Sequence, residues 1–296
     1  MQSNLRPKPI LFIIYILPAF LLYTFIVFVP IVLAAYYGFF EWSGGTQKTF
    51  IGIRNYMELF HDKQFLSALS NNLYLIFICV IGQIGLAFFF AMLLSSRAAR
   101  WKNFHRTISF FPSVLSAVVI GFIWSMIYDY NYGLINTFLK LIGMKDKVQP
   151  WLSNGKIALT LVAIPLIWQY IGYYLIIIMS SIASIDSQIF EMAEIDGATG
   201  IKKAVYITLP LIKNTLAVCV TLCIAGNMKA FDHIFTMTGG GPGDATSVVA
   251  LYAYKTSFAS YKMGYGSAVS IGILVVSLLF VGLTRLFMAR LTRDKE

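Results

Sequence analysis

The chain of 296 residues has a formal net charge of +10, yet only 12% of its residues are charged, whereas 58% are hydrophobic. A soluble globular chain has about a quarter charged residues, so this composition excludes an ordinary soluble domain. Uncharged runs follow one another at 9–40, 64–96, 107–128, 157–185, 214–228 and 263–284. All but 214–228 exceed the roughly 20 residues that cross the hydrocarbon core as a helix, and none alternates as a barrel strand does.

The runs predict an all-α integral membrane protein with six transmembrane helices, at about 10–37, 66–95, 107–129, 157–183, 212–237 and 264–288. The first run is too long for the apolar part of a signal peptide, and no small-residue cleavage site ends it. We therefore interpret it as a retained helix, which Pro18 and Pro30 can kink. Between the first two helices, Ile53–His61 predicts a short amphipathic helix on the outer surface. No separate soluble domain is expected within 1–296.

Basic residues predict the orientation, because cytoplasmic loops of membrane proteins carry an excess of Lys and Arg. The basic residues gather near the N-terminus, in the loop after the second predicted helix and near the C-terminus: Arg6, Lys8, Arg97, Arg100, Lys102, Arg106, Arg285, Arg290, Arg293 and Lys295. Both termini are therefore expected in the cytoplasm. The positive charge then reflects topology and anionic lipid headgroups rather than a nucleic-acid partner.

Three cysteines, Cys79, Cys219 and Cys223, lie in apolar runs. Cys219 and Cys223 share a helix face, which could suggest a pair of metal ligands. Buried small side chains are the favoured interpretation, and no metal site or disulfide framework is expected.

A charged segment, 186–213, interrupts the apolar pattern between the fourth and fifth helices. It carries acids next to small residues, and Gly197 permits a backbone turn that a side chain would resist. Pro210 lacks a backbone N–H and marks a bend before the fifth helix. The pattern predicts a short helix, a turn, a second short helix and a bend, with an apolar docking side that includes Ala193. From these residues alone, an ordinary amphipathic inner loop is equally consistent.

Glu191-Met192-Ala193, Gly197 and Ile207-Thr208-Leu209-Pro210 together resemble the coupling motif of ABC-importer permeases, in the form found in the carbohydrate-uptake, maltose permease-like family. Met192 departs from the usual central Ala of that motif. Residues 51–60, 231–243 and 263–268 resemble further parts of the same family. The resemblance implies the type I ABC-importer permease fold. It also implies that 191–210 couples the chain to an ATPase subunit, through Glu191, Ala193, Glu194, Asp196, Gly197 and Pro210.

A separate motor is expected, because a phosphate-binding P-loop needs Gly-Lys-Ser/Thr and the run Gly239–Gly243 lacks it. The chain is therefore predicted to be no enzyme and to bind no cofactor itself. ATP and Mg²⁺ are expected on two partner ATPase subunits.

Polar and aromatic residues in the fourth and fifth helices are candidates for a substrate path: Gln169, Tyr170, Tyr173, Asn227 and Asp232. Aromatic faces can pack on a sugar ring, and amides can bind its hydroxyls. An aromatic interface belt or helix packing is the alternative for each single residue. The resemblance implies that Gln169, Tyr170 and Tyr173 lie near sugar-contacting positions, and that Asn227 matches a sugar-binding Asn. Ala230 replaces a second such Asn.

Other polar residues have open roles. Lys229 could pair with Asp232 or His233, or extend toward the outer interface. Asn71 and Asn72 are expected to hydrogen-bond between helices.

The function predicted is the membrane subunit of a solute-binding-protein-dependent sugar importer in a bacterial inner membrane. The expected partners are a second permease and an extracellular solute-binding protein. The two permeases are expected to form a heterodimer, with a homodimer as the alternative. A glycerol-phosphate-type permease is an alternative. An ion-coupled transporter would depend on Asp232 alone, and a membrane enzyme would need a catalytic constellation that the sequence does not display.

Overall fold

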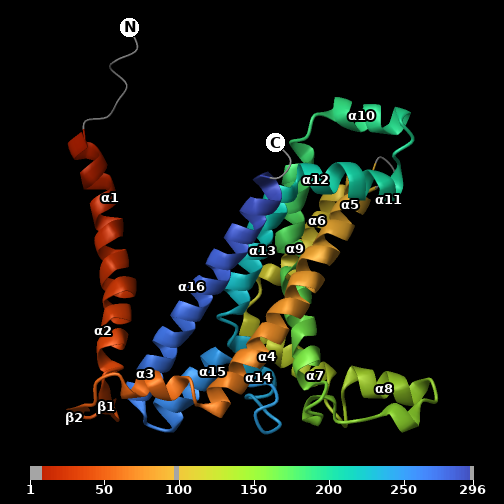
Figure 1. Cartoon of the computed structure of the whole chain (residues 1–296). Helices are drawn as coiled ribbons and strands as arrows, with labels where there is room; N and C mark the ends of the chain where they lie inside the picture. The colour runs from red at the N-terminus through yellow and green to blue at the C-terminus, as the bar shows by residue number, and fades with distance from the viewer. Residues whose placement is uncertain (1–8, 97–99, 294–296) are drawn as a thin grey trace. The chain divides into compact units, whose positions relative to one another are not determined.

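The computed structural model describes residues 9–96 and 100–293, which are mostly helical (Figure 1). They form two compact units. One contains the residues up to Asp62 together with Ala253–Leu274, and the other contains Lys63–Tyr252 with the residues from Val275 onward. Arg6, Lys8, Arg97 and Lys295, which contribute to the predicted orientation, lie outside the described residues.

Within the described ranges, four helices are long and apolar enough to cross a membrane: Ile14–Tyr37, Lys63–Ser95, Ala158–Ala183 and Met263–Leu286. Two further pairs of helices reach this length only when each bent pair is taken as one span: Lys102–Val114 with Ala117–Ile127, and Gly200–Leu211 with Lys213–Asn227. The described residues therefore hold between four and six candidate spans.

The first unit begins with a helical rod and continues into a small hairpin and a short helix. Its elements are α1 (Pro9–Tyr23), η1 (Thr24–Phe28), α2 (Val29–Tyr37), β1 (Phe40–Trp42), β2 (Lys48–Phe50) and α3 (Arg54–Leu59). The two strands pair antiparallel, with Phe40 opposite Phe50. This two-stranded sheet was not predicted.

The second unit is built around α9. Its elements in chain order are α4 (Lys63–Cys79), η2 (Val80–Gly85), α5 (Leu86–Ser95), α6 (Lys102–Val114), α7 (Ala117–Ile127), α8 (Leu134–Leu141), η3 (Lys145–Lys147), η4 (Trp151–Ser153), α9 (Ala158–Ala183), α10 (Ser187–Ile195), α11 (Gly200–Lys202), η5 (Lys203–Thr208), α12 (Leu209–Leu211), α13 (Lys213–Asn227) and α14 (Asp232–Met237). The last elements of the chain, α15 (Val249–Tyr254), η6 (Lys255–Ala259) and α16 (Met263–Arg293), contribute residues to both units. In this unit α10, α11 and α12 gather at one end of α9, and α7, α8 and α14 at the other (Figure 1).

The core of the second unit forms where α9 meets its neighbours. Leu175 and Ile178 of α9 are fully buried, as are all three cysteines, in agreement with their predicted role as buried small side chains. Gly172 allows α6 to approach α9 closely, since a Cβ there would collide with the carbonyl of Ser109. Close backbone approach through a glycine is common between membrane helices.

The predicted third helix over 107–129 is interrupted. The structure has α6 and α7, bent by 98° at a break of two residues, Leu115 and Ser116, whose backbones are extended. Pro112 precedes the break and removes one helical hydrogen-bond donor. The freed carbonyl of Leu115 accepts a hydrogen bond from Nε2 of Gln169 at 3.0 Å, so α9 stabilises the bend.

The predicted fifth helix over 212–237 is also interrupted. It consists of α13 and α14, with residues 228–231 between them, and the backbone of Phe231 is non-helical. A straight helix would have carried Lys229 and Asp232 along its length. The break instead directs them toward the cavity described below.

Candidate functional site

A cavity of about 310 Å³ opens in the second unit between α9 and the broken α13–α14 segment. Its wall mixes aromatic rings, amides and two charged groups with apolar side chains. The lining residues are Gln83, Ala117, Leu166, Tyr170, Tyr173, Tyr174, Leu222, Gly226, Asn227, Lys229, Ala230, Phe231, Asp232 and His233.

Four of the five residues predicted for a substrate path meet at this cavity: Tyr170, Tyr173, Asn227 and Asp232. They come from three elements: Tyr170 and Tyr173 from α9, Asn227 from the end of α13, and Asp232 from the start of α14. Tyr170 and Tyr173 are 38% and 39% exposed, so their rings are available to a bound molecule.

Gln169 is not among the lining residues. Its side chain is 2% exposed and binds the carbonyl of Leu115 in the break between α6 and α7. It faces away from its neighbour Tyr170 because adjacent positions on a helix do not share a face. Its place in the structure is that of a residue that stabilises the bend.

A buried polar chain connects Gln83, Cys223 and Asn227 at the cavity wall, and of these Gln83 was not predicted to belong to the site. Nε2 of Gln83 donates to the carbonyl of Leu166 at 3.1 Å, and the thiol of Cys223 donates to Oε1 of Gln83 at 3.2 Å. Nδ2 of Asn227 in turn lies 2.9 Å from the carbonyl oxygen and 3.4 Å from the Sγ of Cys223. Gln83 is 1% exposed, and the only signal in the sequence is one amide within the apolar stretch 73–96.

Asn72 extends this chain, since its Nδ2 donates to the backbone carbonyl of Asn227 at 3.0 Å. Asn71 binds the carbonyls of Asp244 and Ser247 at 3.1 and 2.9 Å. The prediction that Asn72 hydrogen-bonds between helices is confirmed. Asn71 instead fastens α4 to the glycine-rich loop.

The charged residues of the cavity are Lys229 and Asp232, both exposed. Among the described residues the two form no ion pair with each other, although they stand three positions apart. The break between α13 and α14 removes the continuous helix that such a pair would need. Both charges therefore remain available to a bound molecule.

The second feature of interest is the predicted coupling loop, which protrudes at the opposite end of α9 from α14 (Figure 1). Asp186 caps α10 by accepting a hydrogen bond from the backbone N–H of Gln188 at 3.0 Å. Gly197, with φ +76°, ends α10 in a left-handed conformation. The N–H of Ala198 then bonds to the carbonyl of Ala193 at 2.8 Å, and that of Gly197 to the carbonyl of Glu194 at 3.2 Å. This is the Schellman arrangement of a helix end.

The predicted order of helix, turn, helix and bend is present. The second helical segment, Gly200–Leu211, meets α13 at 78°. Pro210 lies inside that segment, and the bend comes two residues later, at Ile212. Pro210 is tolerated there because it stands in the first turn of α12.

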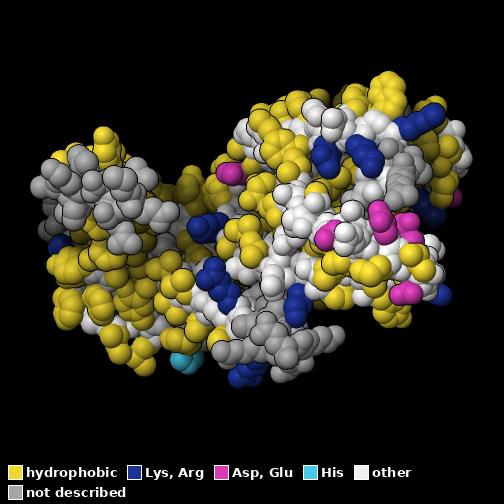
Figure 2. All heavy atoms as spheres, turned by 90° about the horizontal axis from the view of Figure 1, so that it is seen from above, with side chains coloured by type: hydrophobic (Ala, Val, Ile, Leu, Met, Phe, Trp, Pro, Cys, Tyr) yellow, Lys and Arg dark blue, Asp and Glu magenta, His cyan; other side chains and the backbone are white. Residues whose placement is uncertain are grey.

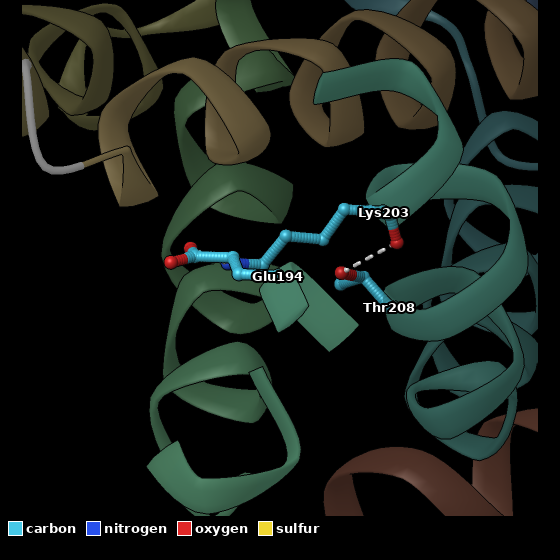
Figure 3. A network of polar contacts seen from close by, with 3 residues as sticks. All are labelled: Glu194, Lys203 and Thr208. Atoms are coloured by element: carbon cyan, nitrogen blue, oxygen red, sulfur yellow. Dashed lines mark hydrogen bonds and ion pairs between the residues drawn. The ribbon is translucent and has the colours of Figure 1, made fainter. Parts of the chain in front are cut away.

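Lys203 fastens α10 to the second helical segment. Its Nζ lies 3.0 Å from Oε1 of Glu194 and 4.6 Å from the ring centre of Phe190. Figure 3 shows the long side chain of Lys203 reaching toward Glu194, while its carbonyl accepts a hydrogen bond from the hydroxyl of Thr208 at 3.3 Å. The loop is therefore a folded unit with its own internal contacts.

The exposed side of this loop combines acidic and apolar groups. Figure 2 shows Asp and Glu side chains gathered beside hydrophobic ones on the face seen from above. Glu191, Glu194 and Asp196 are exposed, as are Met192 and Ile195 at 57% and 85%. Ala193, predicted to belong to the docking side, is 5% exposed and packs inward instead.

Comparison with known proteins gives one family. The model of that family, described as "Binding-protein-dependent transport system inner membrane component", matches residues 83–293. The matched range includes the cavity residues and the whole segment 186–213.

Relatives match over nearly the full length. The chain is 34% identical over 267 residues to the "Probable ABC transporter permease protein YurN" of Bacillus subtilis (strain 168), covering 90% of this chain and 91% of that protein. It is 29% identical over 286 residues to the "Diacetylchitobiose uptake system permease protein NgcF" of Streptomyces coelicolor, covering 93% of this chain and 81% of that protein.

A solved structure shares the fold. The chain superimposes with a TM-score of 0.84 and 21% identity on a chain of a bacterial alginate ABC transporter in complex with an alginate pentasaccharide-bound periplasmic protein. The match covers 95% of each chain.

Proposed function

Since the chain belongs to the family of binding-protein-dependent transport system inner membrane components, we propose that it is the transmembrane subunit of an ATP-driven importer of a sugar or oligosaccharide. The observation that carries this proposal is the cavity, where Tyr170 and Tyr173 stand beside Asn227 and Asp232. Rings suit the apolar face of a sugar, and amide and carboxylate groups suit its hydroxyls. The relative named for diacetylchitobiose uptake supports a carbohydrate cargo.

In this proposal the chain crosses the inner membrane of a bacterium six times, with each bent pair of helices forming one span. Both termini and the segment 186–213 lie in the cytoplasm. Basic residues support this orientation, because Arg100, Lys102 and Arg106 follow the second span and Arg285 and Arg290 stand in the last helix. The cavity then lies toward the outer side of the membrane from the coupling loop.

The segment 186–213 is proposed to dock into a separate ATPase subunit, which binds ATP and Mg²⁺. Exposed Glu191, Asp196 and Ile195 would contact that partner, whereas Ala193 and Gly197 would shape the loop. Closure of two ATPase subunits would move the loop as a body, because Lys203 holds its two helical parts together. Pro210 belongs to the second of these parts.

The assembly also requires a second permease and an extracellular solute-binding protein. One chain cannot enclose a path across the membrane alone, and a heterodimer of two permeases is proposed. The structural relative in complex with a periplasmic protein supports a binding-protein partner.

A second candidate cargo is an anionic molecule such as a glycerol phosphate. Lys229 favours it, because its exposed ammonium group lines the cavity. Asp232 opposes it by placing a carboxylate on the same wall. Substitution of Lys229 by Met should abolish uptake of an anionic cargo and leave uptake of a neutral sugar measurable.

Uptake into proteoliposomes tests the proposal. The chain is reconstituted with its second permease, the ATPase subunits and the binding protein, and radiolabelled oligosaccharides are offered outside with ATP inside. We expect accumulation that needs both ATP and the binding protein. Uptake that follows a proton or sodium gradient without ATP would overturn the proposal in favour of an ion-coupled transporter using Asp232.

A further inference from the structure

The short helix α3 in the first unit has three distinct sides. Successive helical positions turn by about 100°. Asn55 and Leu59 are buried at 6% and 5% exposure and form the side that packs against the unit. Arg54, Glu58 and His61 form an exposed polar side.

The third side is apolar and exposed. Ile53, Met57 and Phe60 are 59%, 57% and 78% exposed, and at helical spacing they fall within an arc of about 60°. Phe50, at the end of the preceding strand, is 68% exposed. An apolar stripe beside a polar side on one short helix is typical of a helix lying in a membrane interface.

Hydrogen bonds fix the position of α3 at the end of the span Ile14–Tyr37. Nδ2 of Asn55 donates to the carbonyls of Gly38 and Phe40 at 2.9 and 3.0 Å. The hydroxyl of Tyr56 donates to the carbonyl of Ala35 at 2.8 Å. Burial raises the pKa of Tyr56, so this hydroxyl keeps its proton. The helix therefore lies against the end of this candidate span.

Aromatic rings and a lysine gather at the same end of the span. The ammonium group of Lys48 lies 5.1, 5.3 and 5.1 Å from the ring centres of Tyr36, Tyr37 and Phe40. Tyr side chains concentrate where a span meets the headgroups, and Lys side chains extend toward the same region. The end of the span next to α3 therefore carries the residue types that are typical of a membrane interface.

We propose that α3 lies in the plane of the membrane interface, with Ile53, Met57, Phe60 and Phe50 inserted into the bilayer and with Arg54, Glu58 and His61 facing water. The segment would fix the height of the first span. The proposal requires the span to cross the membrane and is independent of the cargo.

The test uses spin labels on the complete transporter in vesicles of phosphatidylcholine and phosphatidylglycerol. The native cysteines are fully buried, so a nitroxide can be attached selectively to Met57→Cys, with Glu58→Cys as the matched control on the polar side. Collision rates with oxygen, which concentrates in lipid, and with a water-soluble nickel complex are then measured.

We expect oxygen to dominate at position 57 and the nickel complex to dominate at position 58, so that the oxygen-to-nickel ratio is severalfold larger at 57. Equal access of nickel at both positions would overturn the proposal. Protection of position 57 from both reagents would show that a protein covers the stripe, either the second permease or, if the protection requires it, the binding protein. If Met57→Cys fails to assemble, a spin label at Ile53→Cys is expected to show the same excess of oxygen over nickel collisions.

Discussion

The thiol of Cys223 donates a hydrogen bond to Oε1 of Gln83 at 3.2 Å and thereby joins α13 to η2 at the cavity wall. Nδ2 of Asn227 is held by the carbonyl oxygen and the Sγ of the same cysteine, at 2.9 and 3.4 Å. Its Oδ1 is therefore the atom we expect to accept a hydrogen bond from a cargo hydroxyl. One buried thiol thus links the helix packing to the orientation of a cavity residue.

Removing this thiol should destabilise the protein more than removing an equally buried one. Cys223→Ala leaves Oε1 of Gln83 without its donor, and an unsatisfied buried acceptor costs about 1–3 kcal/mol. Cys219→Ala is the control, since Cys219 is also fully buried but, within the described chain, makes no hydrogen bond with Gln83. Unfolding in detergent should show the larger loss for Cys223→Ala and recovery in Cys223→Ser. Equal losses in the two Ala variants would refute the role of the bond.

Six apolar runs and one charged segment made the helices and the loop predictable, because span length and helix-breaking residues are local properties. The breaks at Leu115–Ser116 and at 228–231 were not predictable. The first is held by a tertiary contact, because Gln169 binds it from a helix more than 50 positions away. Gln169 itself was assigned to the substrate path for the same reason. Its amide could serve a sugar or a backbone carbonyl, and only packing distinguishes the two.

The same limit applies to the cavity and the loop. Tyr170 and Tyr173 could be named because their chemistry suits a sugar, whereas Gln83 could not, since a lone amide in an apolar run is usually a packing residue. In the loop, the glycine turn followed from the Asp196-Gly197 sequence. The inward position of Ala193 did not, because burial of a small residue depends on what the folded loop packs against it.

The ion pair between Lys203 and Glu194 is expected to act on coupling rather than on stability. Glu194 is 42% exposed, and such a pair contributes about 0.2–1 kcal/mol. Lys203→Met should therefore fold normally yet lower the stimulation of ATP hydrolysis by the loaded binding protein, because α10 is no longer fastened to the second helical segment. ATPase assays of the reconstituted complex measure this.

Lys202→Met is the matched control for that variant. Lys202 is the exposed neighbour and forms no ion pair in the part of the chain that the structure describes. It should leave the stimulation unchanged. A similar loss of stimulation in both lysine variants would mean that the positive charge of the loop is needed for coupling and the ion pair between Lys203 and Glu194 is not.

Substitutions of Gly197 can distinguish backbone strain at the turn from steric blocking of a partner. The φ of +76° at Gly197 penalises a side chain by about 1–2 kcal/mol, although a Cβ there would meet nothing within 4 Å. Gly197→Asn should be tolerated best, since Asn visits this conformation, and Gly197→Ala should loosen the end of α10. Gly197→Arg fills the open space and should abolish stimulated ATP hydrolysis while insertion into the membrane stays normal. Wild-type stimulation in Gly197→Arg would refute docking of a partner at this turn.

Substitutions of Tyr173 and Gln169 should have different effects, the first on uptake and the second on stability, although the two residues are four positions apart on α9. A neutral hydrogen bond contributes about 0.5–1.5 kcal/mol, so Tyr173→Ala, which removes a cavity hydroxyl and ring, should raise the KM for uptake by about 2–10-fold or more. Basal ATP hydrolysis and thermal stability should change little, since Tyr173 is 39% exposed. Gln169→Leu should instead lower the unfolding temperature, because it strips the buried carbonyl of Leu115 of its donor. Uptake titrations and unfolding curves of both variants, with Tyr132→Ala as an exposed aromatic control at 90%, distinguish these outcomes. An unchanged KM in Tyr173→Ala would place the cargo contacts on the partner permease.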